Sequence, residues 1–391
     1  MTDGGWLPPR GLLLHIGPHK TGTTAIQQAM ANARPALRRH GVVYPGDGGQ
    51  HRMPALAITG TRGVVGLRPP RIAEWDLLIK DVVAARRRRV VVSAEAFVEA
   101  DDATAQRIVA DLGGERVRVV ITLRPLAKIL PSAWQQMVRN RLRSTYDEWL
   151  DDVFNRPTER RQIANFWHRH HHDEVLDRWL SIVGPDRIAV VVADDVDRLV
   201  LPRSFESLLG LPEGLLVAPD VRDNRGLTAA EIELVRQVNV AFHERGWSSE
   251  LYHRVVRAGG IVGMQTRTPS ADEARIVTPA WAVERANEIA KVAAEHIRGS
   301  GALVLGDLDT LSGVVANGQG SGPAVAELPV AAAEQTLAGV RRQIALIKAP
   351  PPPEGGARPV GSMTLGELVG AVAERGRRRL SASLGLGIHR D

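Results

Sequence analysis

One strand-to-helix junction near the N-terminus constrains the fold of this chain more than any other feature. Residues 11–16, GLLLHI, form an apolar run that leads into a glycine-rich turn. In residues 23–41, apolar side chains recur at helical spacing, and Gly41 closes the run. We therefore predict a strand, a tight loop and a helix in this order, which is the unit from which parallel α/β sheets are built.

Three more segments have the composition of buried strands. Residues 90–92, 117–123 and 188–193 are short, almost continuously apolar runs rich in β-branched residues, and helical patterns separate them. Strands of this kind are typical of a parallel sheet that helices cover on both faces. We predict an α/β fold, a three-layer sandwich with a central parallel sheet flanked by helices.

The amino-acid composition of the chain changes near residue 300. Before it, a helix is expected after Thr228, which forms a capping box with Glu231. Beyond it the sequence becomes rich in Gly, Ala and Ser, with a proline run and a basic segment near the end. We predict one α/β domain over 1–300 and a poorly packed, partly disordered tail over 301–391 with two short helices, around 331–347 and 364–380. The second of these either is solvated or contacts an anionic surface through its arginines.

Composition excludes several classes of protein. The chain has 391 residues, no cysteine, a net charge of +6 and 4% aromatic residues. Without cysteine it forms no disulfide, uses no catalytic thiolate and binds no zinc through sulfur. The low aromatic content argues against a base-stacking nucleic-acid platform. No signal pattern and no membrane-spanning run occurs, so we expect a cytoplasmic protein. The positive charge fits an anionic ligand, although an arginine-rich composition alone also produces it.

The opening loop departs from the P-loop of nucleotide triphosphatases. Gly17 and Gly22 have the glycine spacing of G-x-x-x-x-G-K-[ST], but Thr23 occupies the lysine position and Lys20 lies at the crest of the loop. The nearest apolar run ending in a magnesium-holding aspartate is VVADD, residues 191–195, late in the chain. A kinase with this loop would lack its phosphate lysine.

The stretch PHKTGTT, residues 18–24, resembles the 5′-phosphosulfate loop of sulfotransferases that use 3′-phosphoadenosine 5′-phosphosulfate (PAPS). In this family a Pro-Lys-x-Gly-Thr-Thr turn holds the donor, and here His19 is inserted between proline and lysine. The resemblance implies that Lys20 stabilises the leaving phosphate without a metal ion. It also implies that the 5′-phosphate is held by the amides and hydroxyls of Thr21, Gly22, Thr23 and Thr24. His19 either contacts phosphate or only shapes the turn.

A second region extends the resemblance, which covers residues 12 to about 239. Family members hold the 3′-phosphate of PAPS with an arginine at a strand end and a serine two turns along the next helix. Here these residues are Arg124 and Ser132. An arginine offers a forked donor to phosphate oxygens. On their own, the two residues would be interpreted as a surface arginine and a serine near a helix start.

Transfer to a hydroxyl requires a base near the acceptor. The two candidates are His51, in the loop after the first helix, and Glu95, at the end of the second predicted strand, which alternatively orients Lys20. We predict no metal site: the histidines of residues 168–172 are too close in sequence to converge on one ion from a helix.

The prediction from sequence is therefore a PAPS-dependent sulfotransferase. Its acceptor is a hydroxyl or amine of a small molecule, glycan, lipid or natural product, with no nucleic-acid partner. Two alternatives stay open: a P-loop nucleotide or small-molecule kinase, and a non-catalytic nucleotide-binding scaffold. Acceptor identity and oligomeric state do not follow from the sequence.

Overall fold

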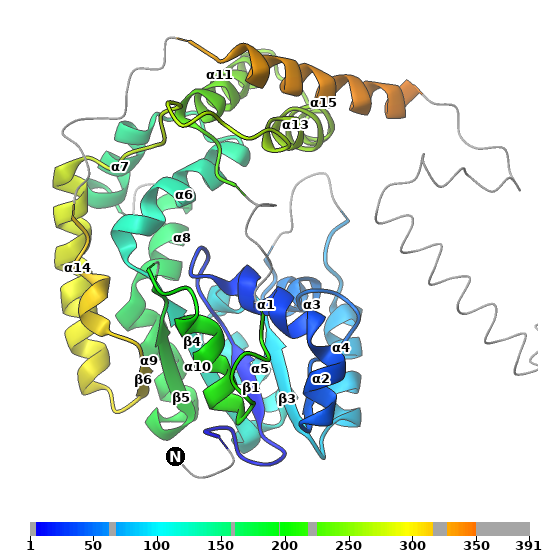
Figure 1. Ribbon diagram of the computed structural model, residues 1–391, viewed down its shortest axis with the longest axis vertical. Helices are drawn as coiled ribbons and strands as arrows, with labels where there is room; N and C mark the ends of the chain where they lie inside the picture. The colour runs from blue at the N-terminus through cyan, green and yellow to red at the C-terminus, as the bar shows by residue number, and fades with distance from the viewer. Residues whose placement is uncertain are drawn as a thin grey trace, which may run out of the picture. The chain divides into compact units, whose positions relative to one another are not determined.

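The computed structural model divides the chain into two units, Met1–Gln343 and Ile344–Asp391. The fold described below belongs to the first unit (Figure 1). The structure describes residues 5–61, 68–157, 161–194, 196–217, 225–315 and 327–348.

A six-stranded sheet with the order β2-β3-β1-β4-β5-β6 forms the centre of the fold. Every neighbouring pair is parallel. The strands are β1 Leu12–His15, β2 Val42–Val43, β3 Arg89–Ser93, β4 Val117–Leu123, β5 Ile188–Val192 and β6 Leu303–Leu305. The four predicted strands are all present, but the sequence analysis missed β2 and β6. These edge strands contain two and three residues, too few to show a period.

The helices follow the strands and also form a separate layer. The α-helices are α1 Thr23–Asn32, α2 Arg34–Arg39, α3 Arg52–Ile58, α4 Ile72–Ala84, α5 Asp102–Leu112, α6 Leu126–Arg139, α7 Tyr146–Asn155, α8 Arg161–His170, α9 His172–Val183, α10 Val200–Leu209, α11 Ala229–Glu244, α12 Ser249–Tyr252, α13 Val262–Gln265, α14 Ala280–Gly299 and α15 Val330–Lys348. The short helices are η1 Glu95–Glu99, η2 Gly114–Arg116, η3 Pro185–Arg187 and η6 Leu308–Leu311, and η5 His253–Ile261 is a π-helix.

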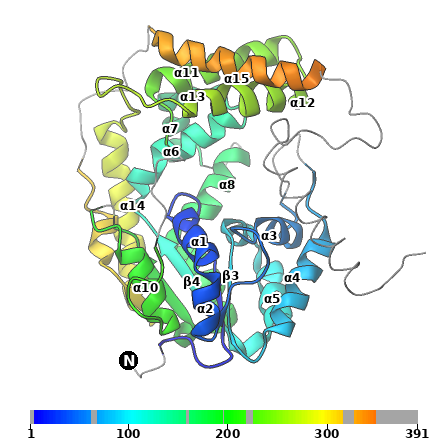
Figure 2. The ribbon, with the colours of Figure 1, turned by 45° about the vertical axis from the view of Figure 1, so that its right-hand side comes forward.

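Two hydrophobic cores cover the two faces of the sheet. Successive side chains of a strand point to opposite faces, so Leu12 and Leu14 face one core while Leu13 faces the other. The first core includes side chains of α3, α4, α5, α9 and α14. The second includes α1, α2 and α10, which lie on the near side of the strands in Figure 2. The predicted three-layer α/β sandwich is confirmed.

A third core lies among helices alone and was not foreseen from the sequence. Its buried side chains come from α6, α7, α8, α11, α12, η5, α13 and the first half of α14. Trp134, Trp149 and Phe166 are among its largest members. Because α6 starts directly after β4, this helical layer begins at the carboxyl edge of the sheet. It therefore borders the edge at which ligands of parallel sheets bind.

Two sequence predictions need correction. The helix expected over 23–41 is broken at Ala33, and Pro35 lies in the first turn of α2. The boundary expected at residue 300 is too early, because β6 pairs with β5 and Leu311 is fully buried in the core of the sheet.

The helix expected over 331–347 corresponds to α15. The helix expected over 364–380, with its arginines, lies outside the described residues. No helix in the described ranges is long and apolar enough to cross a bilayer.

Candidate active site

Three strand ends meet at one edge of the sheet. In the strand order, β1 lies between β3 and β4. The loop after β1 carries Lys20, Glu95 comes two residues after β3, and Arg124 directly follows β4. The carboxyl ends of parallel strands share an edge, so these three residues gather there as the sequence predicts.

The shape of the loop depends on a glycine and a strained lysine. A Cβ atom at Gly17 would lie 2.2 Å from Oγ1 of Thr122 and 2.7 Å from Oγ1 of Thr23, so no larger residue fits. Lys20 adopts φ 71°, in the left-handed region that costs a non-glycine residue about 1 kcal/mol or more. The surrounding structure therefore holds Lys20 in a conformation that it would not adopt by itself.

A buried polar network supports the loop from below. The hydroxyl of Thr21 donates to the carbonyl of Pro18 at 2.8 Å and lies 2.8 Å from Oγ1 of Thr122. The ring of His15 lies between strands, with Nε2 3.1 Å from Oγ1 of Thr122 and Nδ1 2.8 Å from Oγ of Ser93. Burial lowers the pKa of His15 to about 3, so this ring stays neutral at physiological pH.

The network involves two of the threonines of the loop. Thr21 and Thr23 are buried and their hydroxyls face the protein, whereas Thr24 is exposed. The hydroxyl of Thr21 is therefore engaged within the protein, and that of Thr23 lies 3.4 Å from it, so the expected contacts of these threonines with phosphate stay a prediction. The main-chain amides remain: within the described part of the chain, no N–H of residues 19–24 donates a hydrogen bond. Such amides at the start of a helix form an anion cradle.

His19 joins the loop to two carboxylates. Its Nδ1 lies 2.8 Å from Oε2 of Glu95, and its Nε2 lies 3.8 Å from Oε1 of Glu99. Arg169 of α8 pairs with the same Glu99 oxygen. Burial acts to lower the pKa of His19, but the hydrogen bonds to the two carboxylates outweigh it and raise the pKa. Both ring nitrogens face acids, so the structure favours the shaping role of His19 over phosphate contact.

Glu95 stays ionised in this setting. Burial acts to raise its pKa, but the hydrogen bond from His19 and the nearby charges of His19 and Lys20 prevail and lower it. The pKa of Lys20 is lowered by burial, which Glu95 opposes and to which the charges of Arg139 and Arg124 add. A carboxylate and a cationic amine therefore lie within electrostatic reach of each other at the crest of the loop.

The guanidinium of Arg124 contacts the main chain of the loop. Its Nη1 donates to the carbonyl oxygen of Lys20 at 3.4 Å. Ser132 is half-buried on α6, where its hydroxyl donates to the carbonyl of Ile129 at 2.9 Å. The arginine is therefore brought to the loop directly, whereas the hydroxyl of Ser132 is bonded to the main chain of its own helix.

The structure argues against His51 as a base. The ring is 5% exposed, its Nε2 lies 3.1 Å from the carbonyl of Pro45, and its Nδ1 accepts from the amide of Ser93 at 3.1 Å. Burial lowers its pKa to about 4. With both nitrogens bound to the main chain, His51 has no free position for a substrate proton. Its expected catalytic role is replaced by a structural one.

Two side chains of the histidine-rich segment are packed into the protein. Among the described residues, no group of three or more His, Asp or Glu side chains converges as metal ligands do. His170 and His172 are both 3% exposed and lie among packed side chains.

Sequence reasoning assigned no role to three members of the site's surroundings. They are Thr122, Ser93 and Glu99, and the first two carry a signal that was available. Each is a polar residue near the C-terminal end of a mostly apolar strand. In a buried parallel strand such a residue is expected to have a specific hydrogen-bond partner.

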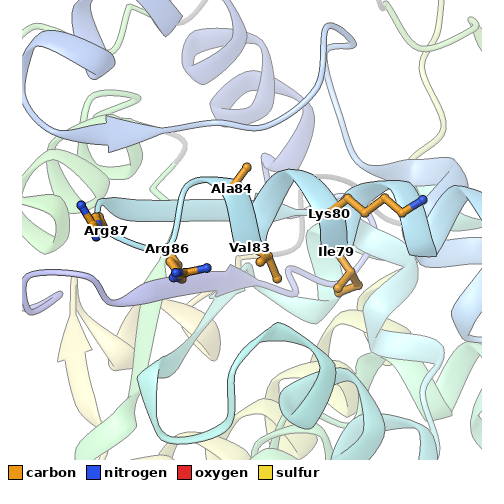
Figure 3. A pocket seen from close by; sticks show the side chains of 6 residues that line it. All are labelled: Ile79, Lys80, Val83, Ala84, Arg86 and Arg87. Carbon is orange, nitrogen blue, oxygen red and sulfur yellow. The ribbon is translucent and has the colours of Figure 1, made fainter.

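A surface hollow elsewhere does not belong to the site. It is lined by residues of α4 and the following turn (Figure 3), namely Ile79, Lys80, Val83, Ala84, Arg86 and Arg87. These last two residues precede β3, so the hollow lies at the amino edge of that strand, opposite the loop.

Comparison with known proteins gives limited similarity. No family model matches the chain, and no curated protein matches it in sequence. A solved structure, that of a sulfotransferase from Alicyclobacillus acidocaldarius, aligns at 17% identity with a TM-score of 0.40. The alignment covers 61% of this chain and 93% of the other.

Proposed function

We propose that the protein is a sulfotransferase that moves a sulfuryl group from PAPS to a hydroxyl or amine of an acceptor. One observation carries the proposal: the loop after β1 holds its lysine at the crest, at φ 71°, with Arg124 bound to the carbonyl of that same lysine. A cation at the crest suits a reaction in which the leaving phosphate gains charge.

The residues fit the two anionic ends of the donor. The unbonded amides of residues 19–24 and the hydroxyl of Thr24 would hold the 5′-phosphate. Arg124 and Ser132 would hold the 3′-phosphate, with the guanidinium as a forked donor. PAPS supplies the activated sulfuryl group.

Lys20 and Glu95 would divide the chemistry. As the acceptor oxygen bonds to sulfur and the bond from sulfur to the phosphate oxygen breaks, Lys20 donates to that departing oxygen. Glu95 receives the acceptor proton. Its lowered pKa makes it a weak base, so the proton moves late, when bonding to sulfur has made the acceptor hydroxyl acidic.

Calorimetric binding of adenosine 3′,5′-bisphosphate without magnesium tests the proposal. We expect binding in the micromolar range that ignores magnesium and exceeds binding of ATP. Arg124→Met should weaken this binding by about 10-fold to 100-fold, which corresponds to the free energy of one hydrogen bond to a charged group. Arg107→Met is the matched control, since Arg107 is 58% exposed on α5 and pairs with Asp111.

Other outcomes point to the alternatives. A preference for magnesium-ATP over the bisphosphate would contradict the proposal and favour a kinase. Bisphosphate binding without turnover across a broad panel of phenols, sugars and amines would favour a non-catalytic scaffold. In the turnover assay, Glu95→Gln should reduce the rate of bisphosphate release from PAPS by about 100-fold or more. The affinity of this variant for the bisphosphate should change little.

A further inference from the structure

A second concentration of positive charge lies beyond the loop, at the end of α6. Arg139 is seven residues after Ser132, so the two share a face of α6 about 10 Å apart along the axis. The Nε of Arg139 is buried and, among the described residues, has no hydrogen-bond partner. The charge of Arg139 acts on Lys20, which connects this region to the loop.

A second arginine, Arg257 of the π-helix η5, lies near the end of α6 that carries Arg139. Its Nη1 donates to Oδ1 of Asn140, the residue after Arg139, at 2.8 Å. The hydroxyl of Tyr252, the last residue of α12 and the one before η5, donates to the carbonyl of Arg139 at 3.4 Å and joins this segment to the end of α6. Burial lowers the pKa of Arg139, and the charge of Arg257 adds to the effect. The guanidinium of Arg257 therefore lies beside the residue that follows Arg139, and its charge, like that of Arg225, acts on Arg139.

The neighbouring acids are already occupied. Glu231, which partly offsets the charge on Arg139, is fully buried and bound by both Arg225 and Arg267. Glu95 is bound by His19. Within the described ranges, no carboxylate pairs with Arg139 or Arg257. Half-buried cations without a counter-ion are unfavourable, and an anionic ligand would relieve that state.

We propose that Arg139 and Arg257 bind an anionic group on the acceptor, so that the substrate class is a hydroxyl or amine compound that also carries a carboxylate, phosphate or sulfate. This inference rests on the proposed sulfotransferase function. The loop and Arg124 account for the two phosphates of the donor, and Arg139 lies two helical turns beyond Ser132. The anion is therefore assigned to the acceptor.

Inorganic phosphate is the probe for this site. Protein saturated with adenosine 3′,5′-bisphosphate is titrated with phosphate, and the midpoint of the thermal stabilisation gives the affinity. Arg139→Met and Arg257→Met should each weaken phosphate binding by about tenfold or more, while bisphosphate affinity changes by less than about twofold. Arg139→Lys keeps the charge and should recover most of the affinity. Arg254→Met is the control, because Arg254 lies on the same helix, is 51% exposed and pairs with Glu250.

Four outcomes separate the possibilities. Loss of phosphate binding with unchanged bisphosphate binding supports the proposal. Weakened bisphosphate binding in both variants would assign the arginines to the donor site. Unchanged phosphate binding would mean that the phosphate is an adventitious ion only. Either result overturns the proposal. Wild-type protein that binds no bisphosphate at all would instead remove the proposed function, and the acceptor assignment with it.

Discussion

Nδ1 of His19 lies 2.8 Å from Oε2 of Glu95, which ties the loop after β1 to the start of η1, two residues after β3. The contact joins two strand ends that are neighbours in the sheet. Glu99 and Arg169 extend it to α8. The crest of the loop is therefore held from the side by a chain of alternating charges.

The pair of His19 and Glu95 should stabilise the folded protein most within a limited range of pH. The lowered pKa of Glu95 contributes stability above the ordinary carboxyl value of 4.5, and this is lost as the pH falls. The raised pKa of His19 contributes stability in full below the ordinary value of 6.5, and this is lost as the pH rises through the folded pKa. His19→Asn should therefore lower the unfolding free energy most between pH 4.5 and pH 6.5. The loss should be about 1 kcal/mol or less, because the ring is partly exposed.

Thermal melting of wild type and His19→Asn across this range measures the difference. His40→Asn is the control, since His40 is exposed at the end of α2. An effect of His19→Asn that does not change with pH would show that the pair adds packing but no charge interaction.

Lys20→Gly should separate stability from binding. Glycine adopts φ 71° without strain, so the variant should gain about 0.5–1 kcal/mol of unfolding free energy, while loss of the amine abolishes tight bisphosphate binding. Chemical denaturation and calorimetry measure the two effects. Arg10→Gly relieves a similar φ of 64° at an exposed residue, so it should gain stability and keep binding. Unchanged binding in Lys20→Gly would exclude Lys20 from the donor site.

Gly17→Ala should distort the loop. Its Cβ would meet Oγ1 of Thr122 at 2.2 Å and Nε2 of His15 at 2.8 Å, so either the loop or the polar network must move. We expect a loss of about 1–3 kcal/mol in unfolding free energy and at least about tenfold weaker bisphosphate binding. Gly299→Ala, where a Cβ meets nothing within 4 Å, is the control. Normal binding in Gly17→Ala would show that the loop geometry is not needed for the ligand.

His51→Gln tests the structural role of this histidine. At neutral pH the unfolding free energy of the variant should be about 1–3 kcal/mol lower than that of the wild type, because the hydrogen bonds of His51 to Pro45 and Ser93 are lost. The folded pKa of about 4 lies below the ordinary 6.5, so protonation favours the unfolded wild type as the pH falls below 6.5. The stability gap between variant and wild type should therefore narrow toward pH 4.

Denaturation at several pH values follows this gap, with the exposed His243→Gln as control. Bisphosphate affinity should change by less than about threefold. A variant of normal stability that binds bisphosphate and has no turnover would restore His51 as the base.

Local sequence patterns determined the building units. Buried parallel strands appear as β-branched runs, which is why β4 spans the predicted residues 117–123. Capping is also local: the helix predicted after Thr228 begins at Ala229 with the expected box to Glu231. The placement of Lys20, Glu95 and Arg124 at one edge followed as well, because every parallel strand presents its carboxyl end there.

The tertiary structure decided which side chains meet and which way they face. The order that places β1 between β3 and β4 joins His15 to Ser93 and Thr122, 78 and 107 residues away. That network holds the hydroxyl of Thr21 inside the protein, and packing buries the ring of His51. A periodic pattern records the exposure of each residue but not its distant partners, so the site's geometry depended on contacts that form only when the sheet assembles.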